Sequence, residues 1–131
     1  MEIILDRSLS KKIAVCGSNE IISDFVNSIS EQIGFEIGKH NGILLCGGMG
    51  GVMEAASRGA KKSNGITVGI LPTSNKTDAN SFTDVIIPTS LGKLRNFFIV
   101  NLADVVIGIA GGWGTLSELS MAMNLNKKLI L

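Results

Sequence analysis

Short apolar runs alternate with longer segments of mixed polarity along most of the chain. Runs of this length and composition are typical of strands buried in a parallel sheet. A shorter run at 84–87 ends at Pro88, and residues 3–5 fit a small edge strand. The main runs that predict strands are residues 12–16, 43–46, 66–71, 103–109 and 128–131.

The segments between these runs carry apolar residues at intervals of three and four, which predicts amphipathic helices. The first helix is expected over 20–37, with Ser18 or Asn19 as its N-cap. Three further helices are expected around 52–60, 91–102 and 116–123. Their expected buried faces are Val52, Met53, Ala56 and Ala60; Leu91, Leu94, Phe97 or Phe98, and Leu102; and Leu116, Leu119, Ala122 and Met123.

Strands that alternate with helices in this way build a parallel sheet with helices on both faces. We therefore expect an α/β fold, a doubly wound parallel sheet of the Rossmann-like type. When only the main runs are numbered, the expected central strand order is 3-2-1-4-5, with the strand at 12–16 in the middle. A length of 131 residues fits a single domain over residues 1–131.

Three of the expected strands end in glycine-containing turns that lead into helices, at Gly17-Ser18, 47–51 and 111–114. Glycine lets the backbone approach a ligand closely, and the free N–H groups of a helix start favour an anion, most often a phosphate. Ligands of doubly wound sheets bind where the winding reverses, so the three turns are expected to meet in one crevice. Glu118 follows one helical turn after Gly114, either as a carboxylate near the mouth of that crevice or as a solvated acid.

The amino-acid composition adds one expectation to this picture, namely that the chain forms contacts between subunits. Hydrophobic residues make up 45% of the chain, charged residues 18%, and the mean hydropathy is +0.37. These values exclude a disordered chain and indicate a homo-oligomer, a dimer or tetramer. The net charge of +1 gives no reason to expect nucleic acid or a membrane as partner. Lysine pairs at 11–12, 61–62 and 127–128 fit the edges of elements.

Two cysteines and one histidine are too few for a zinc site, so no metal site is expected. Cys16 and Cys46 each end an expected strand and are expected to be reduced and buried. His40 is expected at the surface. The first residues lack the basic start and long apolar core of a secretion signal, and no membrane span is present, so we expect a cytoplasmic protein.

Three common site motifs are absent from the sequence. No G-x-G-x-x-G follows the first strand, so the dinucleotide fingerprint is missing. Gly92-Lys93 resembles the end of a phosphate loop, but leucine follows where serine or threonine is required. Ser18 and Ser117 have no histidine near them in sequence, which argues against a nucleophilic hydrolase.

Five segments, taken in order, resemble the LONELY GUY-like proteins, once mislabelled lysine decarboxylases. They are Cys16–Ser18, Gly47–Met53, Gly69–Pro72, Arg95 and Gly111–Glu118. The resemblance implies the doubly wound fold already expected. It also implies a phosphorylated nucleotide ligand, because enzymes of that family hydrolyse the N-glycosidic bond of nucleoside 5′-monophosphates, with the arginine and the glutamate in the active site.

The chain departs from those enzymes at two positions. Ala110 stands where the family's last motif has proline, and Asn96 follows Arg95 where those enzymes have lysine. The Arg-Asn form resembles a sister branch that includes the molybdenum cofactor carrier proteins, which bind a phosphorylated pterin without transforming it.

Two functions therefore stay open at this point. As an enzyme, the chain would use Arg95 to hold the phosphate or ribose and Glu118 to stabilise an oxocarbenium-like centre or activate water. As a carrier, it would bind the ligand with the same turns and no turnover. The purely structural alternative makes Arg95 and Glu118 an ion pair between helices and leaves the glycines as tight turns.

The expected site follows from these hypotheses. Arg95 and Glu118 are the catalytic candidates, and Trp113 is expected to stack on a ring or to form a subunit contact. No resident cofactor is required, and a nucleotide or molybdopterin-type molecule is the expected small phosphorylated ligand. The expected ligand- and phosphate-binding residues are Gly17, Ser18, Gly47, Gly48, Met49, Gly50, Gly51, Pro72, Asn96, Gly111, Gly112, Trp113, Gly114 and Thr115.

Overall fold

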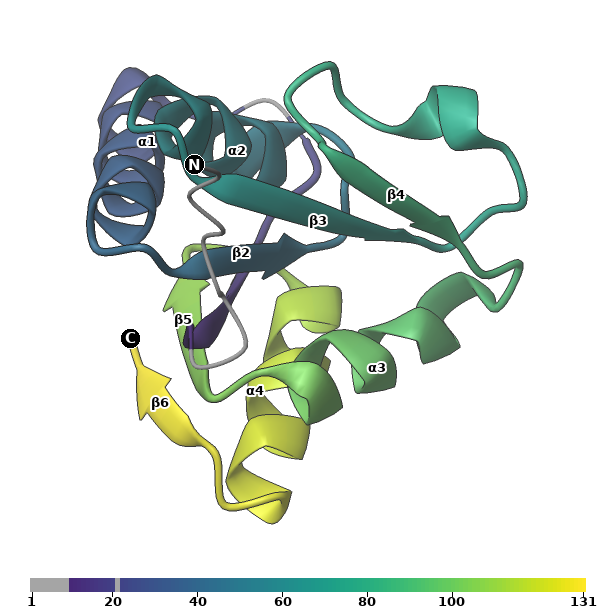
Figure 1. Ribbon diagram of the computed structural model, residues 1–131. Coiled ribbons are helices and arrows are strands. Elements are labelled where there is room, and N and C mark those ends of the chain that lie inside the picture. The colour runs from purple at the N-terminus through teal and green to yellow at the C-terminus, as the bar shows by residue number, and fades with distance from the viewer. Residues whose placement is uncertain (1–9, 21) are drawn as a thin grey trace, which may run out of the picture.

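The computed structural model describes residues 10–20 and 22–131 and contains a six-stranded parallel sheet with strand order β4-β3-β2-β1-β5-β6 (Figure 1). All neighbouring strands pair in parallel. The strands are β1 (Lys12–Gly17), β2 (Ile43–Cys46), β3 (Ile66–Leu71), β4 (Val85–Pro88), β5 (Val105–Ile109) and β6 (Lys128–Ile130).

This order confirms the predicted fold class and central arrangement. The five main runs lie in the predicted order, with β1 between β2 and β5. The short run that ends at Pro88 is a sixth strand, β4, at the edge next to β3. Proline is tolerated there because an edge strand leaves one row of N–H groups unpaired. The strand expected over residues 3–5 lies outside the described residues.

Two pairs of helices cover the two faces of the sheet (Figure 1). Helices α1 and α2 pack on each other and on β1, β2 and β3, whereas α3 and α4 pack on the opposite face. None of the described helices combines the length and apolar character needed to cross a membrane. The helices are α1 (Asp24–Lys39), α2 (Gly51–Lys62), α3 (Arg95–Leu102) and α4 (Trp113–Asn124), with short 3-10 turns η1 (Lys76–Asp78) and η2 (Gly92–Leu94).

The start of α1 differs from the prediction. The helix begins at Asp24, and its N-cap is Ser23, whose hydroxyl accepts a hydrogen bond from the Val26 N–H at 3.2 Å. The predicted caps, Ser18 and Asn19, lie in the preceding turn instead. Several polar residues of this region have side chains able to cap a helix, so the sequence did not distinguish among them.

The buried faces of α3 and α4 also differ from the prediction. The expected stripe on α3 faces outward, and Leu94, Phe98 and Leu102 are exposed, while Ile99 and Val100 pack on the sheet. These helices are apolar on more than one side, so their periodicity could not show which side is buried. On α4 the prediction is confirmed for Leu119 and Ala122, which pack on the core, and wrong for Leu116 and Met123, which are exposed. Thr115 and Glu118 are also buried there.

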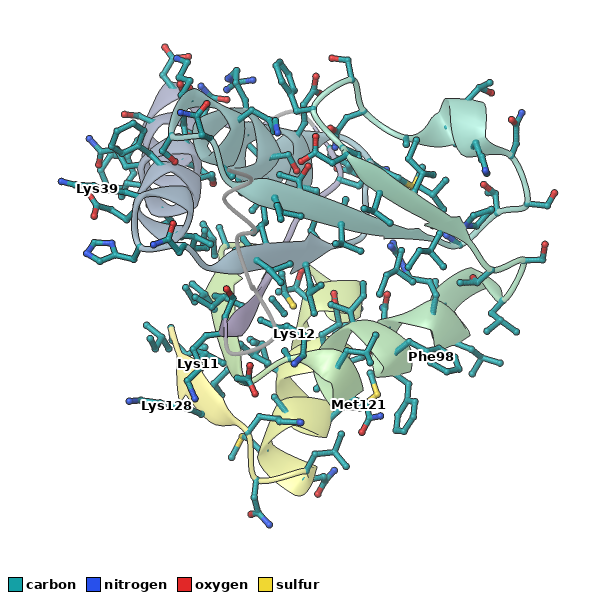
Figure 2. All side chains as sticks on the ribbon, in the orientation of Figure 1. Lys11, Lys12, Lys39, Phe98, Met121 and Lys128 are labelled. Atoms are coloured by element: carbon teal, nitrogen blue, oxygen red, sulfur yellow. The ribbon has the colours of Figure 1, made fainter. Side chains whose placement is uncertain are left out.

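Basic residues gather at the amino ends of the strands. Lys12 and Lys128 begin β1 and β6, and Figure 2 shows both near Lys11 at this end of the sheet. Asp104 accepts a hydrogen bond from the Lys12 backbone N–H at 2.8 Å and pairs with the Lys12 ammonium at 3.7 Å. Two of the lysine pairs that are scattered in sequence thus come together, at the end opposite the glycine turns.

Helices α1 and α2 approach each other unusually closely because both contribute glycines. A β-carbon on Gly34 would lie 1.8 Å from the backbone oxygen of Ala56, and one on Gly59 would lie 1.9 Å from that of Glu31. No side chain fits such a distance without a shift of one helix. This contact fixes α2 against α1 and thereby fixes the glycine turn that begins α2.

We expect Gly59→Ala to lower the free energy of unfolding by about 1–3 kcal/mol, because the added methyl group forces the two helices apart. Gly114→Ala is the matched control, since a β-carbon there meets nothing within 4 Å. Its stability should stay equal to or above that of the wild type, given the higher helix propensity of alanine. Equal stability of the two variants in urea denaturation would show that the close contact does not matter.

Candidate ligand-binding site

A cavity of about 630 Å³ opens at the carboxyl ends of the central strands, where the three glycine turns meet. Its walls come from the ends of β1 and β2, the turn after β3, the start of α3 and the first turns of α4. Most of the predicted site borders this cavity. These residues are Gly17, Ser18, Gly47, Met49, Pro72, Arg95, Asn96, Gly112, Gly114, Thr115 and Glu118.

Five predicted residues lie outside the lining of the cavity: Gly48, Gly50, Gly51, Gly111 and Trp113. The glycines shape the turns. Gly51 has a φ of 57°, and a β-carbon on it would lie 2.1 Å from the backbone oxygen of Ser18. Trp113 is 86% exposed at the first residue of α4, so it is free to meet a ligand edge or a second subunit.

Several residues that border the cavity were not predicted from the sequence. Cys16 lies near the end of a predicted strand and Met53 near the start of a predicted helix, both beside glycine turns. That position was the sequence signal that could have identified them as lining residues. Lys93 belongs to η2. No sequence motif indicates that this turn lies beside the cavity. The full set of additional lining residues is Val15, Cys16, Asn19, Glu20, Met53, Gly92, Lys93 and Ile99.

The two helix starts at the cavity differ in their free N–H groups. At α2, the Gly50 N–H donates to Asn19 Oδ1 at 2.8 Å, and the Val52 N–H donates to the Ser18 oxygen at 2.9 Å. At α4, no side chain caps the helix, and the N–H groups of residues 113–115 have no partner within the described part of the chain. An anion is therefore better accommodated at α4, where unpaired donors and the helix dipole coincide.

Arg95 begins α3 and reaches across to the ends of β2 and β3. One guanidinium nitrogen, Nη1, donates to the Ile70 oxygen at 2.6 Å, while Nε is buried without a partner in the described residues. A β-carbon on Gly47 would lie 2.2 Å from Nη1, so the glycine makes room for the guanidinium. Burial lowers the pKa of Arg95, but an arginine stays charged. Nε is therefore closed off from the cavity, and Nη2, which makes no hydrogen bond with the described residues and is not among their buried unpartnered atoms, is the donor open to a ligand.

Glu118, on α4, is the acidic residue that borders the cavity together with the cation Arg95. The residue is only 8% exposed, and its Oε2 accepts a hydrogen bond from the Cys16 thiol at 3.2 Å. Burial raises the pKa of Glu118, which the thiol hydrogen bond and the charge of Arg95 oppose. Burial and the neighbouring carboxylate likewise raise the pKa of Cys16, so the thiol keeps its proton and acts as a donor. The prediction that Glu118 could be a solvated acid is wrong.

Asn96, on α3, provides a further polar group at the cavity. It is 6% exposed, borders the cavity, and its side chain makes no hydrogen bond with the described residues. Its amide atoms are not among the buried unpartnered atoms of the described residues, so they keep some accessible surface and are open to water or to a ligand group. Thr115, one helical turn before Glu118, is similarly buried.

Arg95 and Glu118 do not form an ion pair; the ion pairs among the described residues all lie elsewhere. This finding disfavours the structural alternative in which the two residues only tie α3 to α4. Instead, a cation and a carboxyl group border one cavity without neutralising each other directly. Such a site can hold a ligand that carries an anionic end and a polar, hydrogen-bonding end.

The described residues contain no cluster of histidine, cysteine and carboxylate side chains that could hold a metal ion. Cys16 and Cys46 are both free and buried, as predicted. They belong to different hydrogen-bonding environments, because Cys46 lies beside Ser57 of α2 and Cys16 beside Glu118 of α4. What the described lining offers a ligand is hydrogen-bonding groups and charge.

A larger hollow, of about 940 Å³, lies at the other end of the sheet beside α1. Aliphatic side chains dominate it, with Ile13, Ile33 and Ile107 among them. Its described lining includes neither a helix start nor an unpaired buried donor. The smaller cavity is the better candidate for a polar ligand, because recognition depends on a few convergent polar groups.

Comparison with known proteins places this chain among relatives of one family. The model of the SLOG cluster4 family matches residues 10–131. An uncharacterized protein of Archaeoglobus fulgidus is 38% identical over 117 residues, which are 89% of this chain and 76% of that protein.

Solved structures show the same likeness. The molybdenum cofactor binding protein of the phototrophic bacterium Rippkaea orientalis is 40% identical, with a TM-score of 0.89 over 92% of this chain and 74% of that one. The molybdenum cofactor carrier protein of Chlamydomonas reinhardtii is 30% identical, with a TM-score of 0.83 over the same shares. DNA processing protein A of Streptococcus pneumoniae, at 19% identity and a TM-score of 0.75, shares the fold alone.

We expect Glu118→Gln to gain stability over the wild type as the pH rises. The raised pKa means that the folded chain keeps a proton which the unfolded chain releases above about 4.5, so wild-type stability falls between that pH and the folded pKa. Each unit by which folding shifts the pKa changes the free energy of unfolding by about 1.4 kcal/mol. Thermal denaturation from pH 4 to pH 8 measures the difference. Glu36→Gln, at an exposed site on α1, should follow the wild type; parallel curves for all three proteins would contradict the burial cost.

Proposed function

Because the chain belongs to the SLOG cluster4 family, we propose that it binds a small phosphorylated ligand, namely the molybdenum cofactor or a related phosphorylated pterin, and carries it without chemical change. Two relatives with solved structures are a molybdenum cofactor binding protein and a molybdenum cofactor carrier protein. Their similarity to this chain, at 40% and 30% identity, supports the carrier function over hydrolysis.

The observation that carries the proposal is the meeting of unpaired donors at one cavity. The start of α4 offers free N–H groups, and Arg95 offers its Nη2, which makes no hydrogen bond with the described residues. Lys93 borders the same cavity and adds a second cation. Phosphate oxygens satisfy donors of both kinds, and each such charge-assisted bond is stronger than a neutral one.

Binding without turnover also suits the rest of the cavity. Cys16 keeps its proton, and the described residues include no histidine in the lining, so the site lacks an activated nucleophile or a histidine base. A carrier needs only to hold and shield its cargo. The glycine turns place backbone close to the ligand, and the cavity volume of about 630 Å³ is within the range of small-molecule sites.

Hydrolysis of a nucleoside 5′-monophosphate is the second candidate function. One observation favours it: the raised pKa of the buried Glu118 is a property of carboxyl groups that donate a proton to a leaving group. Release of free base from a panel of nucleoside monophosphates would support this function. Absence of release by a correctly folded protein that retains ligand would support the carrier.

We expect the wild type to retain isolated molybdenum cofactor through a desalting column, and Arg95→Gln to lose at least tenfold in affinity, since a hydrogen bond to a charged group is removed. Pterin fluorescence of the eluted protein, after oxidation of the cofactor, measures retention. Lys39→Gln, at the end of α1, is the matched control and should retain cofactor normally. Retention by Arg95→Gln equal to that of the wild type would contradict the proposal.

We further propose that the outward face of α3 and α4 binds a second copy of the chain. Leu94, Phe98, Leu116 and Met123 are exposed there, and Figure 2 shows Phe98 on the outer side of α3. The only charged residues of these two helices are Arg95 and Glu118, which border the cavity. Homodimer interfaces have this apolar and uncharged character. Apolar patches of this kind on a soluble domain mark interaction surfaces.

We expect sedimentation velocity to show a dimer or tetramer for the wild type and a shift toward monomer for Phe98→Glu, because a buried unpaired carboxylate opposes association. Phe25→Glu introduces the same charge at a 72% exposed position on α1 and should leave the oligomer unchanged. A monomeric wild type at micromolar concentration would refute the proposal, as would equal effects of the two substitutions.

A further inference from the structure

Glu118 and Asn96 both border the cavity, to which they bring a carboxyl group and an amide. On the premise of the proposed ligand binding, we infer that Glu118 and Asn96 select a heterocycle whose edge carries a ring N–H beside an exocyclic amino group. Guanine and pterins have this edge; adenine, cytosine and uracil do not. The inference concerns the ring of the ligand, whereas the proposed function rests on its phosphate.

Glu118 provides the acceptors for such an edge. Its carboxyl group is held in place on one side, where Oε2 accepts a hydrogen bond from the Cys16 thiol. Its other oxygen, Oε1, has no hydrogen-bond partner among the described residues, and the residue borders the cavity. Two parallel N–H groups on one ring edge match the two oxygens of one carboxylate, which is the geometry of a bidentate pair.

Asn96 completes the pattern. In both guanine and pterin rings, a carbonyl follows the ring N–H along the same edge. The amide of Asn96 can donate to that oxygen, and its side chain is 6% exposed without a partner in the described residues. Its amide atoms are not among the buried unpartnered atoms of the described residues, so they are accessible to a polar ring edge in the cavity.

Discrimination against other bases follows from the same groups. Adenine has a lone pair where guanine has its ring N–H, so the lone pair would face the carboxylate and leave one oxygen unpaired. A buried polar group left without its partner costs more than a hydrogen bond contributes when it is made. Hypoxanthine keeps the ring N–H but lacks the amino group, so it should rank between guanine and adenine.

The test compares GMP, IMP and AMP by isothermal titration calorimetry, with ribose 5-phosphate as the ligand without a ring base. We expect the wild type to bind GMP at least tenfold more tightly than AMP, with IMP between them. In Glu118→Gln the ratio of GMP to AMP affinity should fall to within about threefold, because a neutral amide cannot accept two N–H donors. Glu36→Gln is the matched control and should keep the wild-type ratio.

Two further measurements separate the outcomes. Asn96→Leu, which preserves volume, should also reduce the GMP preference, and thermal denaturation confirms that each variant is folded. Equal affinity of the wild type for GMP and AMP, with ribose 5-phosphate still bound, would overturn the ring inference and leave the proposed function intact. Failure of the wild type to bind any of these phosphates, or the isolated molybdenum cofactor, would overturn both.

Discussion

The parallel pairing of β1 with β2 on one side and β5 on the other is the constraint on which the site depends. Parallel strands end on the same edge of a sheet, and the winding of the chain reverses at β1. The turns after these strands therefore meet without any direct sequence signal that joins them. Gly17 has no room for a side chain, since a β-carbon there would lie 2.6 Å from Val52 and 2.7 Å from the Ile109 oxygen.

Strand order and the position of the cavity could be predicted from sequence because both follow from local patterns and general rules of handedness. Gly17, Gly47 and Gly112 were placed correctly for this reason. The orientation of α3 could not be predicted, because a helix that is apolar on several sides fits more than one rotation. The burial of Glu118 was also missed, since it depends on the depth at which α4 packs beside β1. The hydrogen bond from the Gly50 N–H to Asn19 could not be predicted either, because sequence spacing does not give the position of the Asn19 side chain.

The cavity concentrates features that reduce stability in the free protein. Glu118 is buried with a raised pKa, and Arg95 has a buried Nε without a partner among the described residues. Elsewhere the described structure keeps polar groups paired, apart from the buried hydroxyl of Ser30. Under the proposed function, a ligand that pairs with the accessible groups would relieve part of these costs. The close contact of α1 with α2 lies on the other face of the sheet, where it fixes the glycine turn that begins α2.

The hydrogen bond from the Gly50 N–H to Asn19 makes the two helix starts at the cavity unequal. At α2, oxygens of the chain itself accept from the Gly50 and Val52 N–H groups. The start of α4 has no such acceptor among the described residues. Part of what a bound anion would supply at a helix start is therefore supplied internally at α2 and is left open at α4.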